Sequence, residues 1–318
     1  MVPVFIGGCS RSGTTLLGSV LGAHPDAVCV PESQFKIRLI SSALPAGPLD
    51  RDQVVDWLCS SFRFRIWHLD RASLLESLPS LCSAAELMTS LARFYAQRLG
   101  RAEAGFWIDH TPNNIRYFLL LARTFPPARF IHLVRDPRGV ASSLKPLDWG
   151  PNHSHTCARL WLQQVAFGLA AEDRLGERVL RVRYEDVLED PRAAAQAICR
   201  FLDVEYDPTM LRADGFRVPS YSQGQHRLVG DGLEPSRSRA WERSLSPREI
   251  ELVEATVCDL LDYFGYTARF GASARPLTGW ERLSCSLRDL IRTEVSNRWR
   301  LRRRRRALVR ESVESPGR

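Results

Sequence analysis

Residues 2–21 read VPVFIGGCSRSGTTLLGSVL and carry the clearest structural signal in this chain of 318 residues. An apolar run with β-branched members, as at residues 2–6, is typical of a buried strand. The glycines and serines that follow are typical of a tight loop, and from Thr14 onward the apolar residues recur at helical spacing. A strand, a loop and a helix in this order present backbone N–H groups at a helix N-terminus, where they favour an anion. We therefore predict a phosphate-binding loop at residues 8–15.

Further buried strands are predicted at residues 129–134 and 178–183, with a shorter candidate at 106–108. Helical segments lie between them, and one of these begins at the pair Thr111-Pro112, an N-cap residue followed by a proline at the first helical position. Strands that alternate with helices favour an α/β fold in which helices flank a parallel sheet.

Residues 41–100 interrupt this alternation with helical sequence only. Two interpretations stay open: an acceptor-binding cap inserted above the carboxyl edge of the sheet, or an ordinary helical layer on one face. We divide the chain into a main domain, residues 1–270, which contains this insertion, and a C-terminal helix with a tail, residues 271–318.

The C-terminal segment is amphipathic and basic. Its apolar residues follow at steps of three and four and predict one helical stripe: Trp280, Leu283, Leu287, Leu290, Ile291 and Trp299. Residues 282–310 contain eleven arginines. Three interpretations stay open for this basic helix at 280–310: peripheral contact with an anionic membrane, contact with another subunit or an acidic partner, or simple packing on the main domain.

Composition narrows the class of protein. The chain is 44% hydrophobic, which is enough for a large core, and its net charge is +8. Without the eleven tail arginines the chain is close to neutral, so we expect no nucleic-acid partner.

We expect a cytosolic protein because the N-terminus lacks the basic and long apolar parts of a signal peptide and no apolar run reaches about 18 residues. The eight cysteines are scattered singly, which favours free buried thiols over disulfides or a metal site.

The loop chemistry restricts the kind of anion. The spacing from Gly8 to Gly13, followed by hydroxyl residues, resembles a nucleotide P-loop, but Thr14 stands where the P-loop lysine would be. The nearest cation is Arg11, inside the loop. Such a site suits a phosphate better than a nucleoside triphosphate with magnesium. The alternative is a glycine turn that binds nothing.

Two motifs together resemble one family. Arg-Ser-Gly-Thr-Thr at residues 11–15 resembles the 5′-phosphosulfate loop of sulfotransferases that use 3′-phosphoadenylyl sulfate (PAPS), and VRDPRGVASS at residues 134–143 resembles their 3′-phosphate motif. The arginine in the loop is similar to that of the protein-tyrosine sulfotransferases and their bacterial relatives.

The resemblance implies a P-loop NTPase-like sulfotransferase fold, PAPS as co-substrate, adenosine 3′,5′-bisphosphate as product, and no metal. It also implies the residues that hold the co-substrate. They are Arg11, Ser12, Gly13, Thr14 and Thr15 for the 5′-phosphosulfate, Arg135 and Ser143 for the 3′-phosphate, and Tyr184 for the nucleotide.

Two catalytic residues follow from the same resemblance. Glu32, in Val-Pro-Glu-Ser, matches the family's general base; the alternative is a solvated or helix-capping carboxylate. His110 stands in Asp-His-Thr-Pro where the family usually has Lys-Thr-Pro, whose lysine contacts the transferring sulfonate. The imidazole of His110 would donate a hydrogen bond to the leaving oxygen or act as a second acid/base; the alternative is a helix-start histidine bonded to Asp109.

The sequence thus predicts an enzyme that moves a sulfuryl group from PAPS to a hydroxyl on a peptide tyrosine, a sugar, a lipid or a small metabolite. Two other functions stay open. A P-loop kinase would use Mg-ATP, and the threonine at position 14 counts against it. A non-catalytic protein would bind the nucleotide only. The oligomeric state is open.

Overall fold

The computed structural model describes residues 1–219 and 232–299. The chain forms two compact units, and each is assembled from three separate segments of the sequence. The first unit comprises Met1–Gly8, Gly13–Val134 and Ala166–Glu234. The second comprises Cys9–Ser12, Arg135–Val165 and the chain from Pro235 onward. The predicted boundary at residue 270 stays a prediction, since the second unit contains residues on both sides of it.

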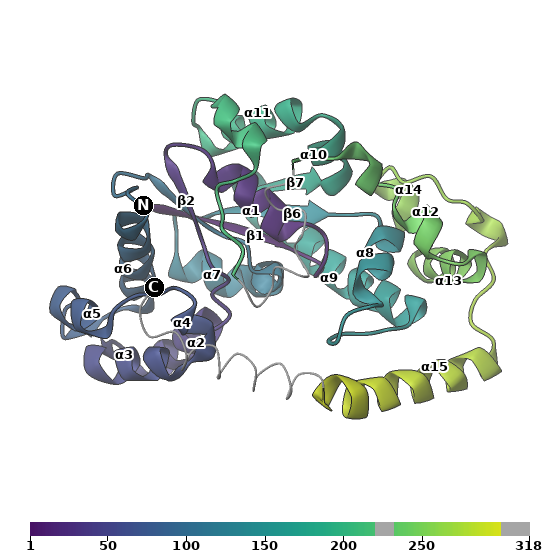
Figure 1. Cartoon of the computed structure of the whole chain (residues 1–318), viewed down its shortest axis with the longest axis horizontal. Helices are drawn as coiled ribbons and strands as arrows, with labels where there is room; N and C mark the ends of the chain where they lie inside the picture. Colours follow the sequence, from purple (N-terminus) through teal and green to yellow (C-terminus); the bar gives the residue numbers. More distant parts are fainter. Residues whose placement is uncertain (220–231, 300–318) are drawn as a thin grey trace. The chain divides into compact units, whose positions relative to one another are not determined.

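A five-stranded sheet organises the first unit, in the order β2-β5-β1-β6-β7 (Figure 1). All of its neighbouring strands run parallel. The strands are β1 (Val2–Gly8), β2 (Ala27–Val30), β5 (Phe106–Asp109), β6 (Arg129–Val134) and β7 (Val179–Arg183). The predicted α/β fold is therefore confirmed. The sequence analysis did not predict β2, because four residues after a turn are too short to show a period.

Helices cover both faces of this sheet because successive side chains of a strand point to opposite sides. Phe5 of β1 lies in a core cluster with Trp107 and with Trp67 and Leu87 of the insertion. Val4 and Ile6 lie in the other cluster, with apolar residues of α1 and α11. The insertion therefore forms a core layer on one sheet face, as the second of its two interpretations expects.

The helical elements of the first unit lie between and after these strands. They are α1 (Thr14–Gly22), α2 (Lys36–Ala46), α3 (Arg51–Ser60), α4 (Phe62–Arg65), α5 (Arg71–Ser77), α6 (Ala84–Arg98), η1 (Pro112–Tyr117), α7 (Phe118–Thr124), η2 (Gly176–Arg178), α10 (Tyr184–Glu189), α11 (Pro191–Leu202) and η3 (Pro208–Arg212). The helix predicted from Thr111 begins with the 3₁₀ turn η1. The insertion also contains a two-stranded antiparallel ribbon, β3 (Leu49–Asp50) with β4 (Leu81–Cys82), that the sequence did not suggest.

The second unit is helical. Its elements are α8 (Pro137–Leu144), the first part of α9 (Ser154–Leu175), η5 (Pro235–Arg237), α12 (Trp241–Ser244), α13 (Pro247–Val257), α14 (Leu260–Tyr263), η6 (Gly271–Ser273), α15 (Gly279–Ile291) and the π-helical turn η7 (Arg292–Asn297). Its centre is the buried Arg138, which pairs with Asp136 and Glu254 at 2.7 Å each and lies 4.1 Å from the ring centroid of Trp241. All eight cysteines lie in the described part and are free thiols, as predicted; six are buried, but Cys59 is half-buried and Cys258 is exposed.

Candidate active site

The loop between β1 and α1 has an unusual backbone. Gly13 has φ 100° and the non-glycine residue Arg11 has φ 74°. Left-handed values are rare for residues with a side chain and cluster at functional sites. At Gly13 a Cβ would also lie 2.5 Å from Cδ2 of Tyr184, so only glycine fits. The loop is therefore held in one shape by conformation and by space.

Arg11, Arg135 and Ser143 meet in the second unit. The Nε of Arg11 donates to the Oγ of Ser143 at 3.0 Å. The Nη1 of Arg135 donates to the backbone oxygen of Arg11 at 2.9 Å. The indole of Trp161 in turn donates to the backbone oxygen of Arg135 at 2.8 Å. Two cationic residues and a hydroxyl, predicted from motifs more than 120 residues apart, are thus brought together.

The residues around the start of α1 fit an oxygen-rich anion. Ser12, Thr14 and Thr15 are all buried. Within the described residues the Oγ of Ser12 has no hydrogen-bond partner, and an orphaned buried hydroxyl costs about 1–3 kcal/mol. Gly13, the N-cap, supplies no side-chain bond, and the first turn of α1 contains no acidic residue. The N–H groups of this helix end are therefore available to an anion.

Tyr184 begins α10 directly after β7 and is 4% exposed. Its ring lies against the loop residue Gly13, where an added Cβ would meet the Cδ2 of Tyr184. The structure thus places Tyr184 at the loop; its contact with a nucleotide stays a prediction.

Glu32 follows the edge strand β2 and is half-buried. Its Oε2 accepts a hydrogen bond from the side-chain amide of Gln34 at 2.8 Å. The carboxylate is not a helix cap, since α2 begins at Lys36 and has Phe35 as its N-cap. One of the alternative interpretations of Glu32 is therefore wrong, while its role as base stays a prediction.

A buried ion pair joins Lys36, four residues after Glu32, to Asp109. Lys36 and Asp109 are 1% and 0% exposed, and Nζ lies 3.1 Å from Oδ2. The hydroxyl of Ser33 also donates to Asp109, and that of Thr111 donates to Oδ1 at 2.6 Å. Burial opposes the charge of Asp109, but Lys36 and these hydrogen bonds outweigh it and lower the pKa of Asp109 to about 2. The pair ties the residues after β2 to the end of β5.

Neither Lys36 nor its ion pair with Asp109 was predicted from the sequence. A signal existed, because Lys36 is one of only two lysines and stands between apolar residues. Asn114, which supports the same region, donates to the backbone oxygens of Ile6 at 3.0 Å and Asp109 at 2.9 Å. It therefore joins the carboxyl ends of β1 and β5.

His110 lies in the core of the first unit. It is 2% exposed, its Nδ1 is 3.3 Å from the Sγ of Cys29, and its ring packs edge-on to Phe216 at 4.6 Å between centroids. Burial lowers the pKa of His110, although the charges of Glu32 and Asp109 oppose this. The neighbour of His110 is therefore Cys29, whereas the carboxylate of Asp109 pairs with Lys36. Contact of His110 with a transferring group stays a prediction.

Gly18 makes room for this histidine. A Cβ at Gly18 would lie 3.0 Å from that of His110, closer than nearly all real contacts of this kind. His110 thus packs against α1 at Gly18, one helical turn after Thr14.

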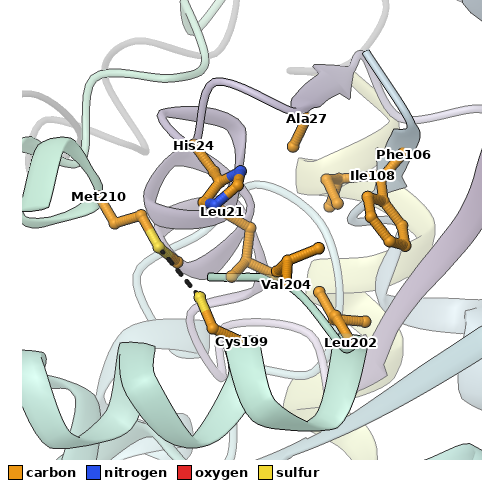
Figure 2. A pocket seen from close by; sticks show the side chains of 9 residues that line it. All are labelled: Leu21, His24, Ala27, Phe106, Ile108, Cys199, Leu202, Val204 and Met210. Atoms are coloured by element: carbon orange, nitrogen blue, oxygen red, sulfur yellow. Dashed lines mark hydrogen bonds between the residues drawn. The ribbon is translucent and has the colours of Figure 1, made fainter. Parts of the chain in front are cut away.

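Figure 2 shows a small apolar pocket near the C-terminal end of α1. Leu21, Phe106 and Met210 line it, and the thiol of Cys199 lies 3.5 Å from the sulfur of Met210. The residues predicted for the co-substrate do not line this pocket. It is a packing defect of the core and not the candidate site.

Comparison with known proteins identifies the family of this chain. Residues 3–208 match the family model described as Sulfotransferase family, which is well over half of the chain. The chain belongs to the sulfotransferase family.

Its relatives are distant. Nodulation protein NoeE of Sinorhizobium fredii is 30% identical over 295 residues, which cover 82% of this chain and 65% of that one. Protein-tyrosine sulfotransferase 2 of Gallus gallus is 24% identical over 214 residues, which cover 65% and 53%. The chain thus spans about half to two thirds of the length of these two relatives.

Two solved structures share the fold. The sulfotransferase domain of the Synechococcus PCC 7002 olefin synthase superposes with a TM-score of 0.60 at 23% identity, covering 84% of this chain and 94% of that one. The sulfotransferase domain from the curacin biosynthetic pathway gives 0.59 at 19%, covering 83% and 97%. The predicted sulfotransferase fold is confirmed.

Proposed function

We propose that this sulfotransferase moves a sulfuryl group from PAPS to a hydroxyl of its acceptor. The observation that carries the proposal is the cluster of Arg11, Arg135 and Ser143. Guanidinium groups and a hydroxyl are donors that match the oxygens of a phosphate or a sulfuryl group. Family membership supports sulfuryl transfer as the reaction.

Each part of the co-substrate has residues that suit it. Residues 11–15 would hold the 5′-phosphosulfate through the N–H groups at the start of α1, the hydroxyls and Arg11. Arg135 and Ser143 would hold the 3′-phosphate, since a guanidinium fork matches a phosphate dianion and a hydroxyl adds a donor. Tyr184 would contact the nucleotide.

The reaction is an in-line displacement at sulfur. Glu32 would take the proton of the acceptor hydroxyl as that oxygen forms its bond to sulfur. The bond from sulfur to the phosphate oxygen breaks, and the donors at the start of α1 stabilise the charge left on the 5′-phosphate. The Lys36–Asp109 pair holds the segment that bears Glu32.

His110 enters this proposal mainly as a support. Its burial beside Cys29 and Phe216 keeps the ring neutral and holds α1 in place. A hydrogen bond from the ring of His110 to the leaving oxygen remains part of the proposal.

The acceptor is proposed to bear a hydroxyl, and the names of several relatives make a peptide tyrosine the first to test. No group of three His, Cys, Asp or Glu residues within 1–219 and 232–299 is placed to bind a metal ion. That no metal takes part stays a prediction, as does a cytosolic location.

Ligand-induced stabilisation tests the proposal. A ligand at about a hundred times its dissociation constant adds about 2.7 kcal/mol to the free energy of unfolding. Adenosine 3′,5′-bisphosphate should raise the unfolding temperature of the wild type, and Arg135→Ala should abolish the rise. Arg129→Ala is the matched control, because Arg129 starts the strand that Arg135 follows.

Stabilisation by Mg-ATP and not by the bisphosphate would overturn the proposal in favour of a kinase. Stabilisation by the bisphosphate without turnover of PAPS on any hydroxyl acceptor would instead leave a non-catalytic nucleotide-binding protein.

A further inference from the structure

Helix α15 and the turn η7 carry most of the large apolar side chains that are strongly exposed in the described chain. Trp280 is 84% exposed and Leu283 64%. Leu287, Leu290, Ile291 and Val295 are each more than half exposed. Along a helix, positions 280, 283, 287 and 290 or 291 lie on one side, so these residues form a continuous apolar stripe. We refer to it as the α15 stripe.

The opposite, polar face of the same helix docks on the second unit. The Sγ of Cys285 lies 2.7 Å from Nε2 of His153. The hydroxyl of Thr156 donates to Asp289 at 2.6 Å, and Arg248 pairs with Glu281 at 2.8 Å. Cys285 is buried, whereas its neighbours on the α15 stripe are not. The helix is thus attached through its polar side.

This orientation is the reverse of the usual one. A surface helix of a soluble protein normally turns its apolar side to the core and its charged side to water. Here specific polar contacts hold the apolar side outward, and the capping box of Thr278 and Glu281 fixes the start of the helix. A contiguous exposed apolar surface of this kind marks an interaction site.

Charge selects the partner. Residues 282–310 contain eleven arginines and only two acidic residues, Asp289 and Glu294. Asp289 is engaged by Thr156, and Glu294 pairs with Arg298 at 2.6 Å. In the sequence from 282 to 310, arginines therefore exceed acidic residues by nine. A second copy of this chain would bring the same charge and repel it.

We propose that the α15 stripe lies on an anionic lipid surface. Its leucines and isoleucine would enter the boundary between headgroups and acyl chains, Trp280 would lie at the headgroup level, and the arginines would contact anionic headgroups. No helix in the described residues is long and apolar enough to span a bilayer. The polar docking contacts would hold the enzyme at the surface. This inference does not depend on the proposed reaction.

Flotation of the full chain with vesicles tests the proposal. The wild type should bind vesicles of phosphatidylcholine with about 30 mol% phosphatidylglycerol, bind pure phosphatidylcholine less, and bind more weakly as salt rises. Leu283→Ser with Leu287→Ser should lower the partition coefficient at least about tenfold. Leu81→Ser with Leu99→Ser is the control, because these leucines are equally exposed but lie in the other unit; it should bind like the wild type.

A second measurement follows Trp280 of the α15 stripe directly. Brominated lipids should quench the fluorescence of Trp280 in the wild type, and Trp280→Phe should remove most of the quenching. Absence of wild-type binding to anionic vesicles at millimolar lipid would overturn the proposal. So would equal binding by the Leu283/Leu287 variant, which would mean that the arginines act alone. A dimer or a complex with an acidic protein that this variant dissociates, without vesicle binding, would assign the stripe to a protein partner instead.

Discussion

Positive charge gathers in two regions of this chain, and it is held in opposite ways. At the loop, Arg11 and Arg135 are fixed by hydrogen bonds to Ser143 and to the backbone. The α15 stripe is exposed, and residues 282–310 of the sequence contain eleven arginines. A fixed cation recognises an anion of one shape, whereas exposed cations attract negative charge in proportion to their number. The first arrangement suits a co-substrate and the second suits a surface.

The largest effect should come from removing the proposed base, Glu32. Glu32→Gln should lower kcat about 10²- to 10⁴-fold, because it removes the base but keeps the shape of the side chain. Affinity for adenosine 3′,5′-bisphosphate should not change. Steady-state kinetics and calorimetry measure the two quantities, and Gln34→Ala is the control. An equal loss of turnover and affinity would show that Glu32 binds the co-substrate and is not the base.

The two lysines sharpen the comparison between buried and exposed pairs. Lys36→Met leaves Asp109 charged and buried without its partner and should cost about 3–5 kcal/mol of stability. Lys145→Met breaks a more exposed pair with Glu249 and should cost no more than about 1 kcal/mol. Urea unfolding measures both. Similar losses for the two variants would contradict the structural role given to the Lys36–Asp109 pair.

The same buried pair predicts a dependence on pH. Since the folded pKa of Asp109 is about 2, below the value of about 3.9 for a free aspartate, its contribution to stability is complete above about pH 4. That contribution is lost as the pH falls toward 2. Denaturation curves from pH 5 to pH 2 should therefore be flatter for Asp109→Asn than for the wild type. Parallel curves would mean that Asp109 does not titrate between these values.

The smallest effects should come from swaps that keep the charge. Arg11→Lys removes the fork that bonds Ser143 and should weaken bisphosphate binding at least about tenfold. Arg288→Lys in α15 should change vesicle binding less than about twofold, because only charge matters there. If Arg11→Lys also binds normally, the loop recognises charge alone and the contrast between the regions disappears.

Local signals explain why much of the fold could be predicted. Asp136 is the N-cap of α8, and its Oδ1 accepts from the N–H of Arg138, two positions away, at 2.8 Å. The strand, loop and helix at residues 2–22 were equally readable, because periodicity and turn residues act over a few neighbours. The meeting of Arg11 with Ser143 was foreseen only by resemblance to a family.

Long-range contacts explain the rest. The neighbour of His110 is Cys29, 81 positions away in the chain, and the partner of Lys36 is at position 109. No spacing rule connects such residues. Residues 215–240 are rich in glycine, serine, arginine and proline, which predicts an irregular loop. Part of this loop, residues 220–231, lies outside the described residues.

Helix α15 shows which features the sequence determines and which the tertiary structure determines. Its sequence by itself determined that a helix forms and that one side of it is apolar, because both follow from residue type and a period of 3.6. Only the tertiary structure decided which side faces outward, through the contacts of Cys285, Asp289 and Glu281 with residues far away in the chain. The physical reason is that an amphipathic pattern specifies the need for an apolar partner, whereas packing and hydrogen bonding decide whether that partner is the core or something outside the chain.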